Sequence, residues 1–249
     1  LHTHRRWIGG SMKTVLKLAG IIAGALVVLV AVMITAAHIT TNSRLAKEYD
    51  LPDESVMVSN DSATVALGRH LAFSRGCTDC HGDDLAGKVR IDANIGKIIP
   101  VNLTQGEGGL PADYSIADYI RAIRHGVGPN KLPNLLMPAG DYNTWSGQDI
   151  GAVIAYVRSV PPVDNVLEKS SLTTFGRVLM MMGELPLIHA EFVDHTRVIS
   201  DAPPYGPTAE YGGYLVMTCI GCHGLTLEGG PVPGFPPEWP EAVNINVSR

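Results

Sequence analysis

Two short stretches decide how this chain is built: Cys77-Thr-Asp-Cys-His and Cys219-Ile-Gly-Cys-His. Each stretch has two cysteines three positions apart, with a histidine directly after the second. The chain of 249 residues has 4 cysteines, and all of them lie in these two stretches. An even number of cysteines in an exported protein usually indicates disulfides. A pair this close, followed each time by histidine, needs another explanation.

The spacing has a chemical reason. Two thiols three residues apart, at the end of a helical turn, can form thioethers with the two vinyl groups of one haem, and the following histidine can ligate its iron. A Cys-x-x-Cys pair alone also fits a thioredoxin-like redox site or half a zinc site, but the histidine makes both weaker interpretations. We therefore expect two covalently attached c-type haems. The residues expected to hold them are Cys77, Cys80 and His81 for the first haem, and Cys219, Cys222 and His223 for the second.

The two stretches belong to an internal repeat. Residues 77–87 align with residues 219–229, and residues 101–104 (VNLT) align with residues 243–246 (VNIN) at the same offset. A similar lead, residues 68–71 and 212–215, precedes each stretch. The sequence therefore predicts two copies of one module.

The first copy has the pattern of a sparse all-α domain. Apolar residues recur at helical spacing after capping residues, and Ser146 has Asp149 three positions later as a capping-box partner. With 6% aromatic residues, 27 glycines and 17 prolines, such a domain would be marginal without a group bound at its centre. The expected helices cover residues 61–76, 115–126 and 146–160.

An uncharged apolar run covers residues 18–37. Twenty helical residues span about 30 Å, the thickness of a membrane's hydrocarbon core. The apolar region of a cleaved signal peptide is shorter, about 7–15 residues, so we expect a retained transmembrane anchor, although Thr35-Ala-Ala also fits a cleavage site. The basic residues Arg5, Arg6, Lys13 and Lys17 precede the run and predict that this end stays in the cytoplasm. We thus expect a single pass through a bacterial inner membrane, with the haem domains on the periplasmic side.

Outside that basic flank, 15 basic and 24 acidic residues remain. Such an excess favours a positively charged protein partner, although simple solubility explains it equally well. No nucleic-acid partner is expected.

The segment between the copies contains an amphipathic piece, residues 172–188, with Met180, Met181 and Met182. At helical spacing, such methionines pack more often than they ligate.

The sixth ligand of the first haem iron is expected to be Met137, which precedes Pro138 between the second and third helices. A thioether ligand raises the potential of the iron and blocks it against external ligands. His125 is a rival ligand, but its place at a helix C-terminus also fits a charge partner for the helix dipole.

These segments together resemble the class I cytochrome c modules of membrane-bound dihaem and trihaem cytochromes that serve periplasmic alcohol and sugar dehydrogenases. The resemblance covers residues 61–249 and implies that His81 and Met137 are axial ligands. It also implies that a loop with Pro100 and Asn102 lines the haem, and it places four further side chains near the haem edge or propionates: Arg121, Arg124, Tyr142 and Trp145. The segments that carry it are residues 77–82, 100–104, 119–126, 137–138 and 149–162.

The second copy departs from this pattern. Its methionine is expected about 142 residues after Met137, whereas the sequence stops at Arg249 with no methionine after Cys222. We expect a truncated second module; a different distal ligand, or none, are the alternatives. The expected organisation is residues 1–17 as a cytoplasmic tail or upstream residues, 18–37 as the anchor, 38–60 as a linker, 61–162 as the first cytochrome c domain, 163–207 as a linker with an amphipathic helix, and 208–249 as a partial second domain.

The expected function is one-electron transfer, without catalytic residues. The donor is expected to be a periplasmic dehydrogenase or a quinol-oxidising complex, and the acceptor a terminal oxidase or a soluble cytochrome. Two alternatives stay open. The chain fits a haem-bearing subunit of a larger respiratory complex, or a dihaem peroxidase-like enzyme whose second iron is open.

Overall fold

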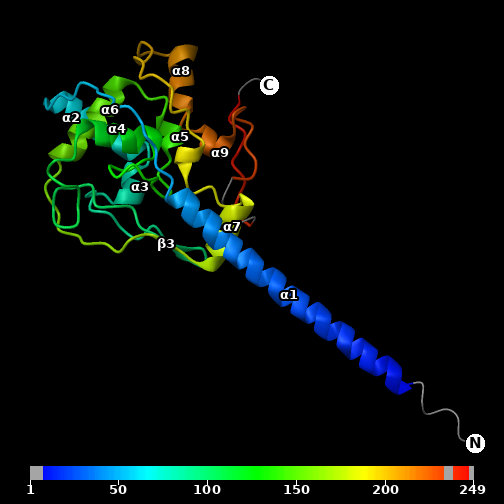
Figure 1. The fold of residues 1–249 in the computed structure, drawn as a ribbon. Helices are drawn as coiled ribbons and strands as arrows, with labels where there is room; N and C mark the ends of the chain where they lie inside the picture. The colour runs from blue at the N-terminus through cyan, green and yellow to red at the C-terminus, as the bar shows by residue number, and fades with distance from the viewer. Residues whose placement is uncertain (1–7, 233–237, 247–249) are drawn as a thin grey trace, which may run out of the picture.

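The computed structural model of the chain describes residues 8–232 and 238–246, and in it one long helix projects from a helix-rich body (Figure 1). The helices of these residues, in chain order, are α1 (Ile8–Leu45), α2 (Ser62–Ser74), α3 (Cys77–His81), α4 (Ile116–His125), α5 (Ala139–Tyr142), α6 (Gly147–Ser159), α7 (Thr174–Met182), the 3-10 turn η1 (His189–Glu191), α8 (Ala209–Val216) and α9 (Ile220–His223).

A small antiparallel sheet accompanies the helices, which an all-α prediction did not include. Its strands are β1 (Ile91–Ala93), β2 (Gly96–Ile98) and β3 (Ser171–Leu172), in the order β1-β2-β3. Gly96 opposes Leu172 with a φ of 134°, and a Cβ at Gly96 would lie 2.2 Å from the carbonyl oxygen of Ser171. Glycine is therefore required at this close approach. Through its hydrogen bonds, the sheet joins the loop after the first motif, which contains β1 and β2, to the segment before α7, which contains β3.

Helices α2, α4 and α6 surround the main core and lie where the sequence predicts them. The Asp61 side chain caps α2 by accepting hydrogen bonds from the backbone of Ala63 and Thr64 at 3.0 and 2.9 Å. Helices α2 and α6 cross closely at Gly68, where a Cβ would lie 1.8 Å from the carbonyl oxygen of Ala152. The buried apolar side chains of this core are Leu71, Leu85, Tyr119, Ile120, Tyr142, Trp145, Ile150, Ala152, Val153, Ile154 and Val157.

The caps of α4 and α6 differ from the prediction. At α4, Ser115 and Asp118 form a complete capping box that was not predicted. At α6, Ser146 accepts the expected hydrogen bond from the Asp149 backbone at 3.1 Å, but the return bond is missing. The hydroxyl of Tyr214, from α8, accepts the Ser146 backbone N–H at 3.0 Å and donates to the Asp149 carboxylate. The predicted capping box at Ser146 was therefore half wrong, because a distant side chain takes over its second bond.

Helix α1 is long and apolar enough over Met12–Leu45 to cross a membrane, by length and composition, and it is a candidate membrane anchor. Helix α7 packs beside its C-terminal end (Figure 1). There the Arg44 side chain donates to the carbonyl oxygen of Met180 at 2.7 Å and pairs with Glu191. The helix predicted over residues 172–188 is shorter than expected because Gly183, with a φ of 84°, ends it. Met180 is buried and packs in a second core, beside the C-terminal end of α1.

Candidate haem-binding site

The first Cys-x-x-Cys-His stretch forms the single helical turn α3. Gly76 precedes the turn with a φ of 81°, and Gly82 follows it with a φ of 86°. Only glycine adopts such values without strain, so these two residues allow the chain to enter and leave the turn sharply. Cys77 and Cys80 are not joined in a disulfide. Both thiols are thus free to react with one group lying beside the turn.

The His81 ring has a fixed orientation. Its Nδ1 atom lies 2.7 Å from the carbonyl oxygen of Val101. A carbonyl can only accept, so Nδ1 carries the proton and Nε2 is left as an unprotonated ligand. Burial lowers the pKa of His81, although the bond to Val101 acts in the opposite direction. The ring is therefore a neutral imidazole at neutral pH, as iron ligation requires.

The loop that carries Val101 is held by Asn102, whose side chain is buried. Its Oδ1 atom accepts from the backbone and the hydroxyl of Thr104, both at 2.8 Å, and its amide donates to the carbonyl oxygen of Val163 at 2.8 Å. Pro100 is half-buried beside this loop. Asn102 thus orders the backbone that orients His81. A direct contact of Pro100 or Asn102 with the haem stays a prediction.

Val101 was not singled out from the sequence, although a signal for it existed. The contact uses its backbone carbonyl, which any residue type supplies, so side-chain chemistry could not identify it. The signal was the alignment of residues 101–104 with 243–246, which kept the same spacing from the motif histidine in both copies.

The second stretch repeats the local geometry of the first. The Nδ1 atom of His223 lies 2.8 Å from the carbonyl oxygen of Val243. The Gly229 backbone donates to the His223 carbonyl oxygen at 2.9 Å, as Gly87 donates to His81 at 2.7 Å. Leu227 and its counterpart Leu85 both have a positive φ, 60° and 58°. The surroundings differ, because no residue of α9 is buried and Cys222 is exposed.

Met137 lies half-buried against the main core, just before α5. Leu136, the residue before it, has a φ of 61° and donates its backbone N–H to the carbonyl oxygen of Leu187 at 2.8 Å. The backbone on both sides of the thioether is therefore constrained, by this turn and by Pro138. Met137 as the axial ligand stays a prediction.

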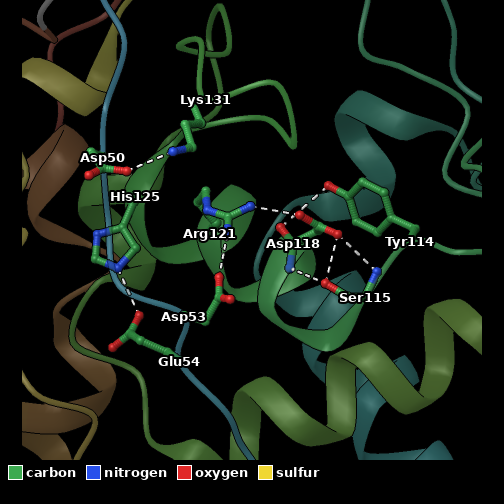
Figure 2. Close-up of polar contacts among 9 residues, drawn as sticks. All are labelled: Asp50, Asp53, Glu54, Tyr114, Ser115, Asp118, Arg121, His125 and Lys131. Atoms are coloured by element: carbon green, nitrogen blue, oxygen red, sulfur yellow. Dashed lines mark hydrogen bonds and ion pairs between the residues drawn. The ribbon is translucent and has the colours of Figure 1, made fainter.

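The rival ligand His125 has other partners, and both of its ring nitrogens are engaged. Figure 2 shows it turned toward Glu54, with Nε2 2.8 Å from Oε2 of that carboxylate. Its Nδ1 atom lies 2.9 Å from Nδ1 of His195. Burial lowers the pKa of His125. These contacts make His125 part of a packed polar cluster at the end of α4.

The two arginines that the resemblance placed near the propionates pair with carboxylates of the protein, and their nearness to a haem stays a prediction. Arg121 lies 2.6 Å from Asp118 and 2.7 Å from Asp53 (Figure 2). Arg124 is fully buried and pairs with Glu54. Their charges therefore hold Asp53 and Glu54, which lie in the segment that leads from α1 to the main body.

Two free thiols and a neutral imidazole with an available Nε2 atom make a donor set that fits a c-type haem. The same part of the chain agrees with a known family. Residues 63–157 match the family model described as cytochrome C oxidase, cbb3-type, subunit III. Residues 63–157 thus form a cytochrome c domain.

Curated relatives agree with this assignment. The chain is 31% identical over 176 residues to the gluconate 2-dehydrogenase cytochrome c subunit of Pantoea cypripedii, a match that covers 66% of this chain and 38% of the relative. It is 29% identical over 130 residues to the fructose dehydrogenase cytochrome subunit of Gluconobacter japonicus, covering 49% of this chain and 26% of the relative. It is also 29% identical over 174 residues to the alcohol dehydrogenase (quinone), cytochrome c subunit, of Gluconacetobacter polyoxogenes, covering 66% of this chain and 36% of the relative.

The chain thus spans well under half the length of these relatives. What the cytochrome c domain itself brings is covalently bound haem and haem-mediated electron transfer. The relatives themselves are cytochrome subunits of dehydrogenases.

Proposed function

We propose that this chain relays single electrons through two c-type haems, from a dehydrogenase to a respiratory acceptor at the outer face of a membrane. The observation that carries the proposal is the shared geometry of His81 and His223. In each, a backbone carbonyl 20 positions later accepts from Nδ1 and leaves Nε2 available beside two free thiols. When bound, a c-type haem supplies a one-electron couple at its iron.

The residues proposed for the first haem are the thiols of Cys77 and Cys80, the His81 imidazole and the Met137 thioether. The second haem is proposed to be held by Cys219, Cys222 and His223. In the first set, Met137 packs against the main core and the carbonyl oxygen of Val101 fixes the orientation of His81. The second set depends on backbone hydrogen bonds, because α9 has no buried residue.

The proposed donor is the catalytic subunit of an alcohol or sugar dehydrogenase, because the three relatives bear such names and two of them match 66% of the chain. The proposed acceptor is a terminal oxidase or a soluble cytochrome. The basic residues that precede the apolar run, Arg5, Arg6, Lys13 and Lys17, support a topology with the haem domains on the periplasmic side. In that arrangement α1 holds the relay at the surface where such dehydrogenases would release electrons.

The family description favours a second candidate, a haem-bearing subunit of a larger respiratory complex. Membrane vesicles that contain the chain distinguish the two. If the donor is a dehydrogenase, adding its substrate (gluconate, fructose or ethanol) should reduce the c-type haem even when quinol-oxidising complexes are inhibited. Reduction by quinol alone would favour the respiratory complex.

Haem attachment is tested by a matched pair of double variants, Cys77→Ala with Cys80→Ala, and Cys219→Ala with Cys222→Ala. Covalent haem per chain, measured by the mass of the intact protein and by its absorbance after denaturation, should fall from two to one in each variant. Full haem content in either variant would refute attachment at the altered stretch.

A further inference from the structure

The two haem-attachment stretches approach each other through a few defined side chains. They are separated by 142 positions in the chain, yet α9 lies beside α5, the short helix that follows Met137 (Figure 1). A Cβ built on Gly221, inside the second stretch, would lie 3.7 Å from Oδ1 of Asp141 in α5. The second stretch therefore contacts the first domain directly.

Arg75 makes the most direct link. It lies two positions before Cys77, and its Nη1 atom donates to the carbonyl oxygen of Leu215 at 3.0 Å and to the hydroxyl of Thr218. Thr218 lies directly before Cys219. One guanidinium thus joins the residues that lead into the first stretch to those that lead into the second.

The first domain holds Arg75 in place from its other side. The buried hydroxyl of Tyr142 donates to the Arg75 carbonyl oxygen at 2.9 Å. The guanidinium carbon lies 6.0 Å from the centroid of the Trp145 ring, which itself packs edge-on against Tyr142. A cation over an aromatic face gains further electrostatic stabilisation. Arg75 is therefore constrained at its backbone and at its charged end.

Tyr214 makes a second set of hydrogen bonds between α8 and the first domain. Its hydroxyl bonds the backbone of Ser146 and the carboxylate of Asp149 at the start of α6. It belongs to α8, which leads into the second stretch. Tyr214 and Arg75 thus both fix the C-terminal end of α8 to the first domain.

We propose that Arg75 is a positioning residue that holds the two haem-attachment stretches side by side, so that electrons pass directly between two haems of one chain. This inference rests on the proposed function, which places a haem on each stretch. Electron tunnelling slows steeply with distance. A side chain that fixes the separation therefore sets the rate without touching either iron.

The test uses the full haem-loaded chain in detergent and the variant Arg75→Met, which keeps an apolar stem against Trp145 but removes both hydrogen bonds. The matched control is Arg69→Met, at an exposed position of α2, the helix that ends directly before Arg75. Covalent haem is counted first. Electron paramagnetic resonance of the oxidised protein then measures the magnetic interaction between the two ferric irons, and potentiometric titration measures how reduction of one haem shifts the potential of the other.

Arg75→Met should retain both haems and lose most of the magnetic interaction and of the potential shift, whereas Arg69→Met should match the wild type. If Arg75→Met does not fold, Thr218→Val removes the partner hydroxyl and should weaken both signals in the same direction. A variant that keeps two haems with an unchanged magnetic interaction and an unchanged potential shift would overturn this inference but leave the proposed function standing. A single haem in the wild-type chain would overturn the proposed function and this inference with it.

Discussion

Replacing Glu54 by alanine should destabilise the protein more than any other single change in the segment between α1 and the main body. The Glu54 carboxylate pairs with Arg124 and lies 2.8 Å from Nε2 of His125. The Arg124 side chain is 0% exposed and that of Glu54 is 19% exposed. Without Glu54, a buried guanidinium would lose its only carboxylate among the residues that the structure describes.

Removing one partner of a buried ion pair costs about 3–5 kcal/mol, because the remaining charge has no counter-charge in a poorly polarisable interior. Arg124 would keep its hydrogen bonds to the carbonyl oxygens of Arg197 at 2.7 Å and Asn143 at 3.3 Å. We therefore expect the lower end of that range, about 3 kcal/mol. For a protein of this size, that loss lowers the melting temperature by roughly 6–12 °C.

Asp53→Ala is the matched control, because Asp53 is one position away and also pairs with an arginine of α4 (Figure 2). The Asp53 side chain is 79% exposed. An exposed pair contributes less than about 1 kcal/mol, and salt screens it. Thermal unfolding of the detergent-solubilised protein, followed by far-ultraviolet circular dichroism at low and high salt, compares the two variants. Equal melting temperatures for Glu54→Ala and Asp53→Ala would refute the reasoning that burial decides the effect.

Three further changes have defined outcomes. Gly68→Ala places a Cβ 1.8 Å from the Ala152 carbonyl oxygen and should lower the free energy of unfolding by about 3 kcal/mol, because it forces α2 away from α6. The control Gly212→Ala, whose Cβ meets nothing within 4 Å, should leave the unfolding midpoint in urea nearly unchanged. Equal midpoints for the two variants would contradict the packing argument. Met137→His should lower the midpoint potential of the first haem, because a thioether raises it; an unchanged potential in a redox titration would exclude Met137 as the ligand. Burial raises the pKa of Asp141 from its ordinary 3.8 to about 6. Between these two pH values the folded protein binds more protons than the unfolded chain, so it loses stability as the pH rises through this window. Near neutral pH, Asp141→Asn should therefore be more stable than the wild type by about 1–2 kcal/mol, after allowance for partial exposure. Its stability should also not fall as the pH rises between these values. A free energy of unfolding that changes with pH in the same way in both proteins would contradict this prediction.

The parts of the fold that follow from neighbouring residues were predictable from the sequence. Helix α2 begins at Asp61 and α4 ends at Gly126 as expected, because a cap or a left-handed glycine acts within a few positions. The two motif stretches were equally clear, since their chemistry depends on spacing alone. The residues that attach and ligate the haem thus stand in the sequence as predictions that await their own tests.

Contacts between distant segments could not be predicted in this way. Tyr214 completes the cap of α6 from 65 positions beyond Asp149, and nothing near Ser146 indicates that its backbone N–H has a tyrosine as partner. Likewise, no residue near Arg124 and His125 in the sequence indicates that the Glu54 carboxylate lies against both side chains. In each case, burial and a remote partner decide the role, and neither leaves a local pattern.

The comparison of the two motif stretches shows which forces shape them. Both have the same backbone turn and the same bond from the histidine ring to a valine carbonyl, although Thr78 is buried in the first and α9 has no buried residue. Local hydrogen bonds are therefore sufficient to form the turn, and the first stretch is in addition partly buried. Because the core does not hold the second stretch, its distance from the first must depend on the side chains that join them. Arg75 and Tyr214 are the described residues that make those hydrogen bonds, so electron transfer between the stretches should be more sensitive to these two residues than to substitutions within the main core.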